Sequence, residues 1–174
     1  FVPMRTLPGM AERTITLNSL SKDYIMTGWR VGYVIAEPYF THTLQTINEN
    51  VVYSAPSISQ RAGIYAIGMR EKIRAQYVQA YKERVFYAAE RIARISGMSI
   101  LPPGGTFYVF PSVSGTGLSS AEFCDKLLHE AHVLALPGSS FGRAGEGFIR
   151  IACTVGREKL AEEFDRMERV FGRS

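Results

Sequence analysis

A long helical periodicity in the middle of the chain limits its possible folds more than any other feature. Seven apolar residues recur there at spacings of three and four: Ile73, Tyr77, Tyr81, Val85, Ala88, Ile92 and Ile95. This spacing places them on one face of an α-helix. At about 1.5 Å per residue the helix would span about 34 Å, enough to bridge two domains. We therefore expect a domain boundary near residue 70.

The charged residues of this predicted helix indicate a solvated outer face. Its many arginines and lysines are interleaved with Glu71, Glu83 and Glu90, which favours solvent contact over nucleic-acid binding. The net charge of the chain is only +4, from 20 basic and 16 acidic residues, and the basic residues form no stripe. We expect no nucleic-acid partner, and an anionic small molecule explains the mild excess better.

Short apolar segments and amphipathic helices alternate along the rest of the chain, a pattern typical of a mixed α/β fold. Strands are expected at residues 14–17, 31–36, 106–110, 133–136 and 148–152. Helices are expected at 39–50 and 58–67, from Ser119 and from Gly156. The 31–36 segment is almost continuously apolar, which is typical of a buried strand.

Two helix ends carry clear local signals. Ser119 is followed three residues later by Glu122, the pattern of a capping box at a helix start. The inner face of that helix is predicted to hold Phe123, Cys124, Leu127, Leu128 and Ala131. The last helix is predicted to bury Leu160, Phe164, Met167 and Phe171, and Gly172 suits its C-terminal cap.

Composition excludes several classes of protein. The chain has 174 residues, 46% hydrophobic and 21% charged, so an ordered chain with a sizeable core is expected. Its apolar runs are shorter than the ~20 residues of a membrane span, and no signal-peptide pattern occurs at the start. Cys124 and Cys153 lie far apart without metal-ligand spacing, which favours a reducing compartment such as the cytoplasm and no metal site.

The most specific segment runs from Ser19 to Tyr33. It presents Lys22 after two serines, and Arg30 follows Gly28 just before the second predicted strand. A lysine acts as a nucleophile when its amine is kept near neutral. A guanidinium and hydroxyl groups can bind an anion. This combination suits a cofactor with an aldehyde and a phosphate.

The same segment closely resembles the cofactor-lysine signature of fold-type I, class I/II aminotransferases, S-x-S-K followed by T-G-W-R-x-G-Y. Three further stretches resemble the family in the same order: Leu7 to Met10, Pro103 to Tyr108, and Pro137 to Gly142 with the 148–151 strand. The resemblance covers essentially the whole chain. It implies a pyridoxal-phosphate-dependent enzyme that moves an amino group between an amino acid and a 2-oxo acid.

The resemblance also implies roles for individual residues. Lys22 would hold pyridoxal phosphate as a Schiff base and carry a proton during the reaction. Arg30, Ser19 and Ser21 would bind the cofactor, Arg30 and Ser19 at its phosphate. Arg150 would pair with the α-carboxylate of the substrate. Family members are homodimers whose active sites use both subunits, so the apolar patch of Asn50 to Ser57 is expected near a subunit boundary.

The family pattern further implies how the chain divides. Residues 1–70 would be the end of the large, three-layer α/β domain that binds pyridoxal phosphate. Residues 71–174 would be the bridging helix and the small C-terminal α/β domain. In the family, the groups that stack on the cofactor ring, pair with its nitrogen and form its phosphate turn precede this segment. We therefore expect a piece of a longer enzyme that is inactive alone.

Several alternatives stay open at this stage. Arg150 could pair with Glu146, and Arg30 with Asp23, in purely structural ion pairs. The glycine-rich 142–147 stretch joins two strands, which favours a plain loop over a phosphate loop. Phe141 could line a substrate pocket or pack in the core. The whole protein could instead be a C–S lyase, or a transcription regulator that senses pyridoxal phosphate, and the amino-acid specificity stays undetermined.

Overall fold

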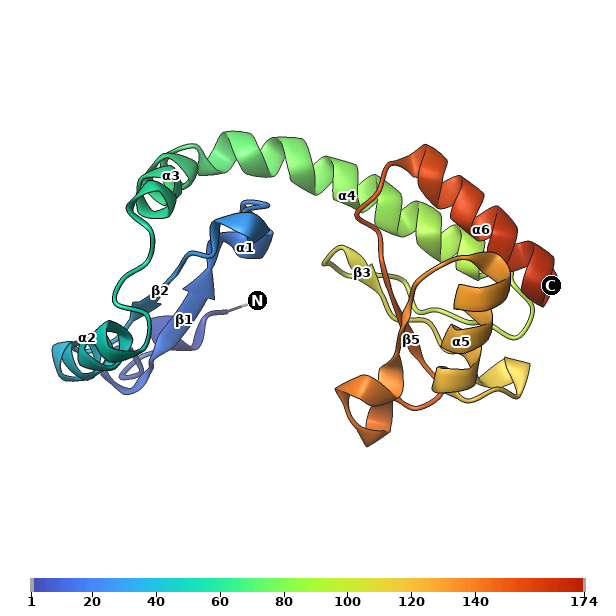
Figure 1. Ribbon diagram of the computed structural model, residues 1–174, viewed down its shortest axis with the longest axis horizontal. Coiled ribbons are helices and arrows are strands. Elements are labelled where there is room, and N and C mark those ends of the chain that lie inside the picture. The colour runs from blue at the N-terminus through green and yellow to red at the C-terminus, as the bar shows by residue number, and fades with distance from the viewer. Residues whose placement is uncertain (1, 174) are drawn as a thin grey trace. The chain divides into compact units, whose positions relative to one another are not determined.

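The computed structural model describes residues 2–173, which fall into two compact units that divide between Gln76 and Tyr77 (Figure 1). The mixed α/β class expected from the sequence is confirmed, because both units combine strands and helices. The expected boundary at residue 70 lies at the start of helix α4 (Arg70–Ile92), whereas the division between units falls inside that helix. Each unit is described by itself below.

The first unit is built around an antiparallel pair of strands, β1 (Thr16–Ser19) and β2 (Gly32–Ile35). Between them the chain forms the short helix α1 (Leu20–Asp23) and a 3-10 turn at Thr27–Trp29. Helices α2 (Pro38–Val51) and α3 (Ser57–Gly68) follow, and two 3-10 turns at Met4–Thr6 and Ala11–Arg13 precede β1. Both predicted helices of this unit are confirmed.

The predicted burial of the 31–36 strand is wrong for this unit. All four residues of β2 are exposed, with Tyr33 at 40% and Ile35 at 42%. The reason is the sheet itself: β2 pairs with β1 in a two-stranded sheet, which leaves its side chains open. An apolar run in the sequence indicates which side chains favour burial but does not supply the layer that buries them. The first strand also lies two residues later than the predicted 14–17 segment.

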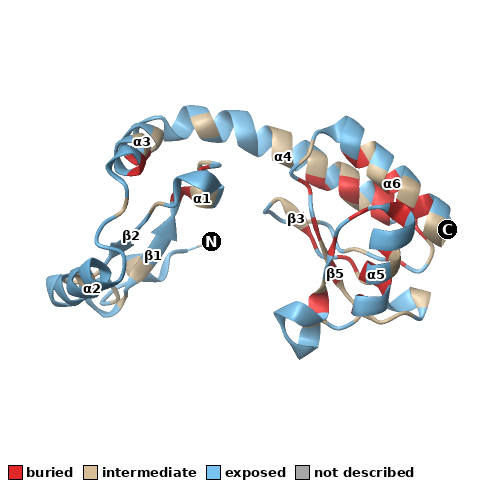
Figure 2. Cartoon of the chain, in the orientation of Figure 1, coloured by how far each residue is buried: buried red, intermediate tan, exposed pale blue. Residues whose placement is uncertain are grey.

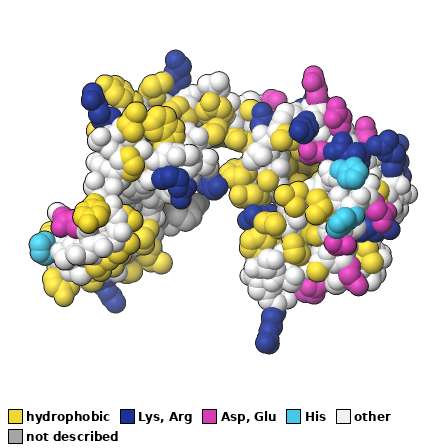
Figure 3. All heavy atoms as spheres, viewed as in Figure 1, with side chains coloured by type: hydrophobic (Ala, Val, Ile, Leu, Met, Phe, Trp, Pro, Cys, Tyr) yellow, Lys and Arg dark blue, Asp and Glu magenta, His cyan; other side chains and the backbone are white. Residues whose placement is uncertain are grey.

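Few side chains of the first unit are buried (Figure 2). Leu20 of α1 is 3% exposed and Met26 is 7% exposed, and Ser59 and Gly63 of α3 are also buried. Large apolar side chains of α2 and α3 remain on the surface, including Val51 at 72% and Ile64 at 70%. Figure 3 shows hydrophobic side chains gathered over the region of these two helices. Apolar surface of this extent is typical of an interaction face.

The second unit contains a three-stranded antiparallel sheet in the order β3-β5-β4. The strands are β3 (Tyr108–Val109), β4 (Leu136–Pro137) and β5 (Ile149–Ala152). The helices are α4 from Tyr77 onward, α5 (Ser120–Ala131) and α6 (Arg157–Phe171). Three 3-10 turns complete the unit, at Ser114–Thr116, Gly138–Phe141 and Arg143–Gly145.

The core of the second unit lies between these helices and β5, where the buried residues of Figure 2 gather. Ile149 and Ile151 of β5 are buried, as are Phe123 and Leu127 of α5. The predicted inner faces of α5 and α6 are largely confirmed. Leu128 was placed inward, but it is 43% exposed.

The long predicted helix ends earlier than its periodicity indicated. Helix α4 stops at Ile92, and Ile95 lies beyond it, buried, in a β-bridge with Arg173. Its apolar face is buried only from Val85 onward, while Tyr77 remains 38% exposed. The predicted solvated face is also wrong at one position, because Arg91 is buried.

The strands of the second unit are shorter than predicted, but its helix caps are confirmed. The 106–110 and 133–136 segments each contribute at most two residues to the sheet. Ser119 and Glu122 form the complete capping box of α5. Gly172 caps α6 with a φ of +83°, a conformation that favours glycine. Within residues 2–173, none of the helices is both long enough and apolar enough to cross a bilayer.

Candidate active site

The connection between β1 and β2 carries four of the predicted site residues. Ser19 is the N-cap of α1, and its hydroxyl oxygen accepts a hydrogen bond of 3.1 Å from the Ser21 backbone N–H. Lys22 lies on α1, near the end of this short helix. The short helix is fixed by Leu20, which is buried and lies against Gly63 of α3. The serines and the lysine therefore sit on a helical turn that is anchored to the unit's small core.

Backbone pairing brings the two ends of this connection side by side. The Leu20 N–H donates to the Val31 carbonyl at 3.2 Å, and Ser19 is the register partner of Gly32. A Cβ on Gly32 would lie 2.5 Å from the Asn18 carbonyl oxygen, so this close approach requires glycine. The pairing places Arg30, two residues before Gly32, next to the segment that begins with Ser19.

Arg30 has an unusual backbone. Its φ is +51°, and Ile25 at the other side of the 3-10 turn has a φ of +54°. Left-handed backbone is costly for β-branched and other non-glycine residues, and such strain clusters at functional sites. Gly28 lies inside the 3-10 turn, and the positive φ angles fall before and after that turn, at Ile25 and Arg30.

The Arg30 side chain folds back over the turn. Its Nη1 donates to the Thr27 carbonyl oxygen at 2.9 Å. Within residues 2–173 the ion pairs do not include Arg30 and Asp23, which removes the main support for the structural ion pair considered from the sequence. A guanidinium has five N–H donors in a planar fork, so one bond to a carbonyl leaves donors for an anion.

These residues fit the chemistry of pyridoxal phosphate. The exposed side chains of Ser19, Lys22 and Arg30 offer a hydroxyl, an amine and a guanidinium within one connection. Ser19 accepts a hydrogen bond from Ser21, and a hydroxyl that accepts can still donate its own proton to a phosphate oxygen. An aldehyde needs the amine, and a phosphate needs the cation and the hydroxyls. The chain thus supplies groups for both ends of such a cofactor.

Arg150 belongs to the second unit, on the central strand β5. It is half-buried, and its guanidinium carbon lies 4.4 Å from the ring centre of Tyr108 and 4.6 Å from that of Phe141. Both distances are typical of cation–π contacts. Aromatic rings cover the faces of a guanidinium and leave its N–H edge for an anion, so the arrangement suits a carboxylate.

The structural alternative for Arg150 is not supported. Glu146 accepts hydrogen bonds from the backbone N–H and the hydroxyl of Ser120, each at 2.8 Å. The ion pairs within residues 2–173 do not include Arg150. The 142–147 stretch is a loop with one 3-10 turn, as predicted.

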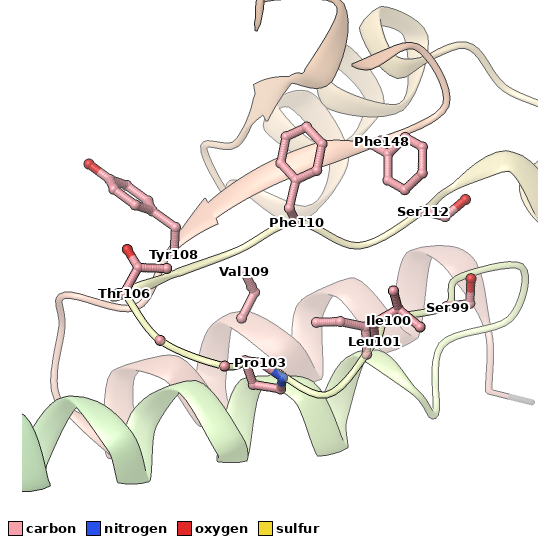
Figure 4. Close-up of a pocket in the computed structure, with 12 residues that line it drawn as sticks. Ser99, Ile100, Leu101, Pro103, Thr106, Tyr108, Val109, Phe110, Ser112 and Phe148 are labelled. Atoms are coloured by element: carbon pink, nitrogen blue, oxygen red, sulfur yellow. The ribbon is translucent and has the colours of Figure 1, made fainter. Parts of the chain in front are cut away.

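An apolar hollow of about 530 Å³ lies beside β3 (Figure 4). Tyr108 and Phe110 point to one side of the strand, and Val109 points to the other. The rings of Phe110 and Phe148 stack with centres 5.5 Å apart, and Pro103 belongs to the opposite wall. Tyr108 therefore borders both this hollow and the Arg150 guanidinium.

Sequence reasoning did not assign Tyr108 a role, and it left Phe141 between pocket and core. The structure places Phe141 at 52% exposure against Arg150, so it is not a core residue. The available signal was alternation, because Tyr108 and Phe110 share one face of the predicted 106–110 strand. Phe141 carried no comparable signal, since it lies on a 3-10 turn.

Other reactive groups lie outside these sites. Burial raises the pKa of both Cys124 and Cys153 to about 11, with Glu163 adding to the effect at Cys153, so both thiols are protonated near neutral pH. The predicted packing role of Cys124 agrees with its burial. In the part of the chain that the structure describes, histidines, cysteines and carboxylates form no group that could hold a metal ion.

Comparison with known proteins gives a consistent result. The family model for "Aminotransferase class I and II" matches residues 3–166. An aspartate aminotransferase of Pyrococcus horikoshii is 39% identical over 160 residues, which cover 91% of this chain and 41% of that protein. An aromatic-amino-acid aminotransferase of Thermococcus litoralis is 37% identical over 167 residues, covering 95% and 43%.

Solved structures agree with the sequence matches. The crystal structure of an aromatic aminotransferase from Pyrococcus horikoshii superposes with a TM-score of 0.85 at 36% identity, covering 95% of this chain and 44% of that one. The chain thus spans less than half the length of the relatives it matches. The matched residues 3–166 include the β1–β2 connection and the surroundings of Arg150.

Proposed function

The chain belongs to the aminotransferase class I and II family, and from that membership we propose that the full protein moves amino groups between amino acids and 2-oxo acids. The observation that supports the proposal is the β1–β2 connection, whose two ends are paired through their backbones and which carries Ser19, Lys22 and Arg30. The division of labour would follow the family: residues 1–70 contribute to cofactor binding, and residues 71–174 form the small domain.

Lys22 would bind the aldehyde carbon of pyridoxal phosphate covalently through Nζ. The Lys22 amine would also accept and hold the proton that leaves the substrate Cα. Bound pyridoxal phosphate supplies the electron sink that allows the α-proton to leave. Arg30, Ser19 and Ser21 would bind the cofactor, with the guanidinium and the Ser19 hydroxyl at its phosphate.

Arg150 would bind the α-carboxylate of the amino acid and of the 2-oxo acid through its N–H edge. Tyr108 and Phe141 hold the guanidinium at 4.4 and 4.6 Å, which restricts its rotation and limits its contact with water. A fixed carboxylate orients the Cα–H bond toward the proton acceptor. This role is shared by all amino-acid substrates, so it does not by itself select a side chain.

The named relatives support transamination over the two alternatives, a C–S lyase and a regulator that senses pyridoxal phosphate. The relatives are named for different donors, aspartate and aromatic amino acids. We therefore propose the reaction, transamination, without naming one amino-acid donor. We also propose a homodimer with the Asn50–Ser57 segment near the subunit boundary, because Val51 is 72% exposed and Tyr53 is 85% exposed there. A cytoplasmic location is also proposed, because Cys124 and Cys153 are free thiols, as is usual in a reducing compartment.

Borohydride reduction of the purified full protein, followed by peptide mapping, tests the central assignment. A pyridoxyl group on Lys22 is expected. Reduction that labels Lys72 or Lys82 instead would overturn it. Lys22→Ala should abolish transamination and leave the far-UV circular dichroism spectrum unchanged, since Lys22 is exposed.

The 174-residue chain by itself is proposed to be inactive. It supplies groups for the aldehyde and the phosphate, but in the family the groups that hold the cofactor ring come from other parts of the protein. The purified chain should therefore produce 2-oxo acid from amino-acid donors no faster than free pyridoxal phosphate does. Faster turnover by the chain alone would contradict the proposal.

A further inference from the structure

The loop that joins β4 to β5, residues 138–147, is rich in glycine and contains no α-helix or strand. It contains four glycines and two 3-10 turns, and Gly142 and Gly147 have φ angles of +123° and +78°. Glycine loses more conformational freedom on folding than any other residue, so a loop of this composition is costly to order. Specific contacts must therefore keep the loop in this conformation. We call residues 138–147 the Phe141 loop, after the aromatic side chain that they present.

The first of these contacts is made by Glu146. Its Oε1 accepts the backbone N–H of Ser120, and its Oε2 accepts the Ser120 hydroxyl, each at 2.8 Å. Ser120 is fully buried at the start of α5, and its hydroxyl oxygen lies 3.0 Å from that of Ser139 in the same loop. The backbone N–H groups at a helix start have no partner within the helix and favour a negative charge. Glu146 lies 26 residues after Ser120, and its carboxylate supplies both a hydrogen-bond acceptor and a negative charge at this helix start.

The second contact is between the two ends of the loop. A Cβ on Gly138 would lie 2.1 Å from the Gly145 carbonyl oxygen, and one on Gly145 would lie 2.0 Å from the Gly138 carbonyl oxygen. Gly138 N–H also donates to the Phe148 carbonyl oxygen at 2.8 Å. The loop is thus closed at its base, directly beside Glu146.

The closed loop presents Phe141 to Arg150. The Phe141 ring centre is 4.6 Å from the guanidinium carbon, and the ring also meets Phe110 edge-on at 6.2 Å. Phe110 in turn stacks on Phe148, which follows the loop (Figure 4). Any movement of the loop away from α5 would therefore take Phe141 off the guanidinium.

We infer that Glu146 is a positioning residue for the substrate-carboxylate site: it fastens the Phe141 loop to the start of α5, and so keeps Phe141 against Arg150. This inference rests on the proposed function of Arg150. Glu146 itself does not contact the guanidinium, so it acts through Phe141. The pKa of Glu146 is lowered by its hydrogen bonds with the Ser120 backbone and hydroxyl, so its carboxylate is charged at neutral pH.

Glu122 provides a matched control. It caps the same helix from within, accepting the Ser119 N–H at 2.9 Å, and its pKa is likewise lowered by hydrogen bonds from Ser119. Glu122 belongs to the capping box, and its hydrogen bonds are with Ser119 rather than with the Phe141 loop. Removing either glutamate weakens the start of α5, but only the loss of Glu146 releases the loop.

The test uses the full-length enzyme with Glu146→Ala, Glu122→Ala, Phe141→Ala and the Glu146→Ala/Phe141→Ala double variant. KM and kcat are measured for each variant with L-aspartate, L-phenylalanine and L-alanine. The melting temperature of each variant is also measured. The strength of one cation–π contact predicts that Glu146→Ala raises KM by about three- to thirtyfold. The factor should be the same for every donor that turns over, because all donors share the α-carboxylate, and kcat should stay within about twofold.

Glu122→Ala should lower the melting temperature to a similar degree and leave KM within about twofold. The double variant should raise KM no more than the larger of the two single effects, because both act through one contact. Glu146→Gln keeps an acceptor for the Ser120 N–H, so its KM should lie between those of the wild type and Glu146→Ala.

Three results would overturn the inference. Equal KM values for Glu146→Ala and Glu122→Ala would reduce Glu146 to a helix cap. Multiplying effects in the double variant would show that Glu146 and Phe141 act separately. If Arg150→Ala leaves KM unchanged for all three donors, the carboxylate role of Arg150 fails and this inference fails with it. A raised KM in Arg150→Ala with an unchanged KM in Glu146→Ala would reject the inference alone.

Discussion

Replacing Arg91 with alanine should destabilise the second unit more than any change at its surface. The Arg91 Nε donates to Glu168 at 2.8 Å and Nη2 donates to Asp165 at 2.6 Å, while Nη1 donates to the Tyr87 hydroxyl at 2.7 Å. Its guanidinium also lies 5.7 Å from the centre of the Phe164 ring. The side chain therefore joins α4 to α6 at several points.

The expected size of the effect follows from what remains after truncation. The Glu168 side chain is only 3% exposed, whereas that of Asp165 is 60% exposed and regains water. Removing one partner of a buried ion pair costs about 3–5 kcal/mol, because the other charge stays buried. Arg173 still contacts Glu168 at 2.5 Å from an exposed position, so the lower end, about 3 kcal/mol, is expected.

The assay is urea unfolding of the 174-residue chain followed by far-UV circular dichroism, with the free energy taken by linear extrapolation. Arg173→Ala is the control, because its side chain is 73% exposed, and it should cost at most about 1 kcal/mol. Replacing the pair together, by Arg91→Met with Glu168→Leu, should restore most of the loss, since no buried charge is left. A loss below about 1 kcal/mol for Arg91→Ala would refute this account of the network.

The same pair predicts a difference in acid sensitivity. Burial raises the pKa of Glu168, but hydrogen bonds from Arg91 and Arg173 outweigh it, so the net pKa lies below its ordinary value of about 4.3. A lowered pKa in the folded state stabilises the fold above about pH 4.3, and this contribution is lost as the pH falls through the folded pKa. Arg91→Ala should flatten this acid-dependent loss. An equally steep loss in the variant would argue against it.

Three further predictions concern the proposed sites and the cysteines. Arg150→Ala in the full enzyme should raise KM for every amino acid and 2-oxo acid by tens- to thousandsfold, from the cost of about 2–5 kcal/mol for truncating a buried charge pair. Arg157→Ala, at the start of α6, should leave KM unchanged, and equal KM values in both variants would show that Arg150 is structural. Tyr53→Glu should weaken self-association of the full protein in analytical ultracentrifugation, and a wild-type enzyme that is fully active as a monomer would contradict the proposed boundary. Cys124 and Cys153 should resist a thiol reagent at pH 8 until urea unfolds the chain, because with a pKa of about 11 only about one thiol in a thousand is ionised. Rapid labelling of the folded chain would contradict their burial.

The sequence by itself determined those features that depend on near neighbours. Ser119 and Glu122 are three residues apart, and the capping box they form needs nothing from the rest of the chain. Gly172 ends α6 for the same reason, because only the local backbone requires its positive φ. The order of helices and strands followed from periodicity, and the aminotransferase resemblance followed from a contiguous signature around Lys22.

Only the tertiary structure decided which side chains are covered and which partners they meet. The basic face of α4 was predicted to be solvated, yet Arg91 is buried against Asp165 and Glu168, residues more than seventy positions later. Glu146 was considered a partner of Arg150, but it binds Ser120, and two aromatic rings contact Arg150 instead. Periodicity states which way a side chain points on its own element. The element packed opposite it is set by the fold, and burial and charge pairing depend on that second surface.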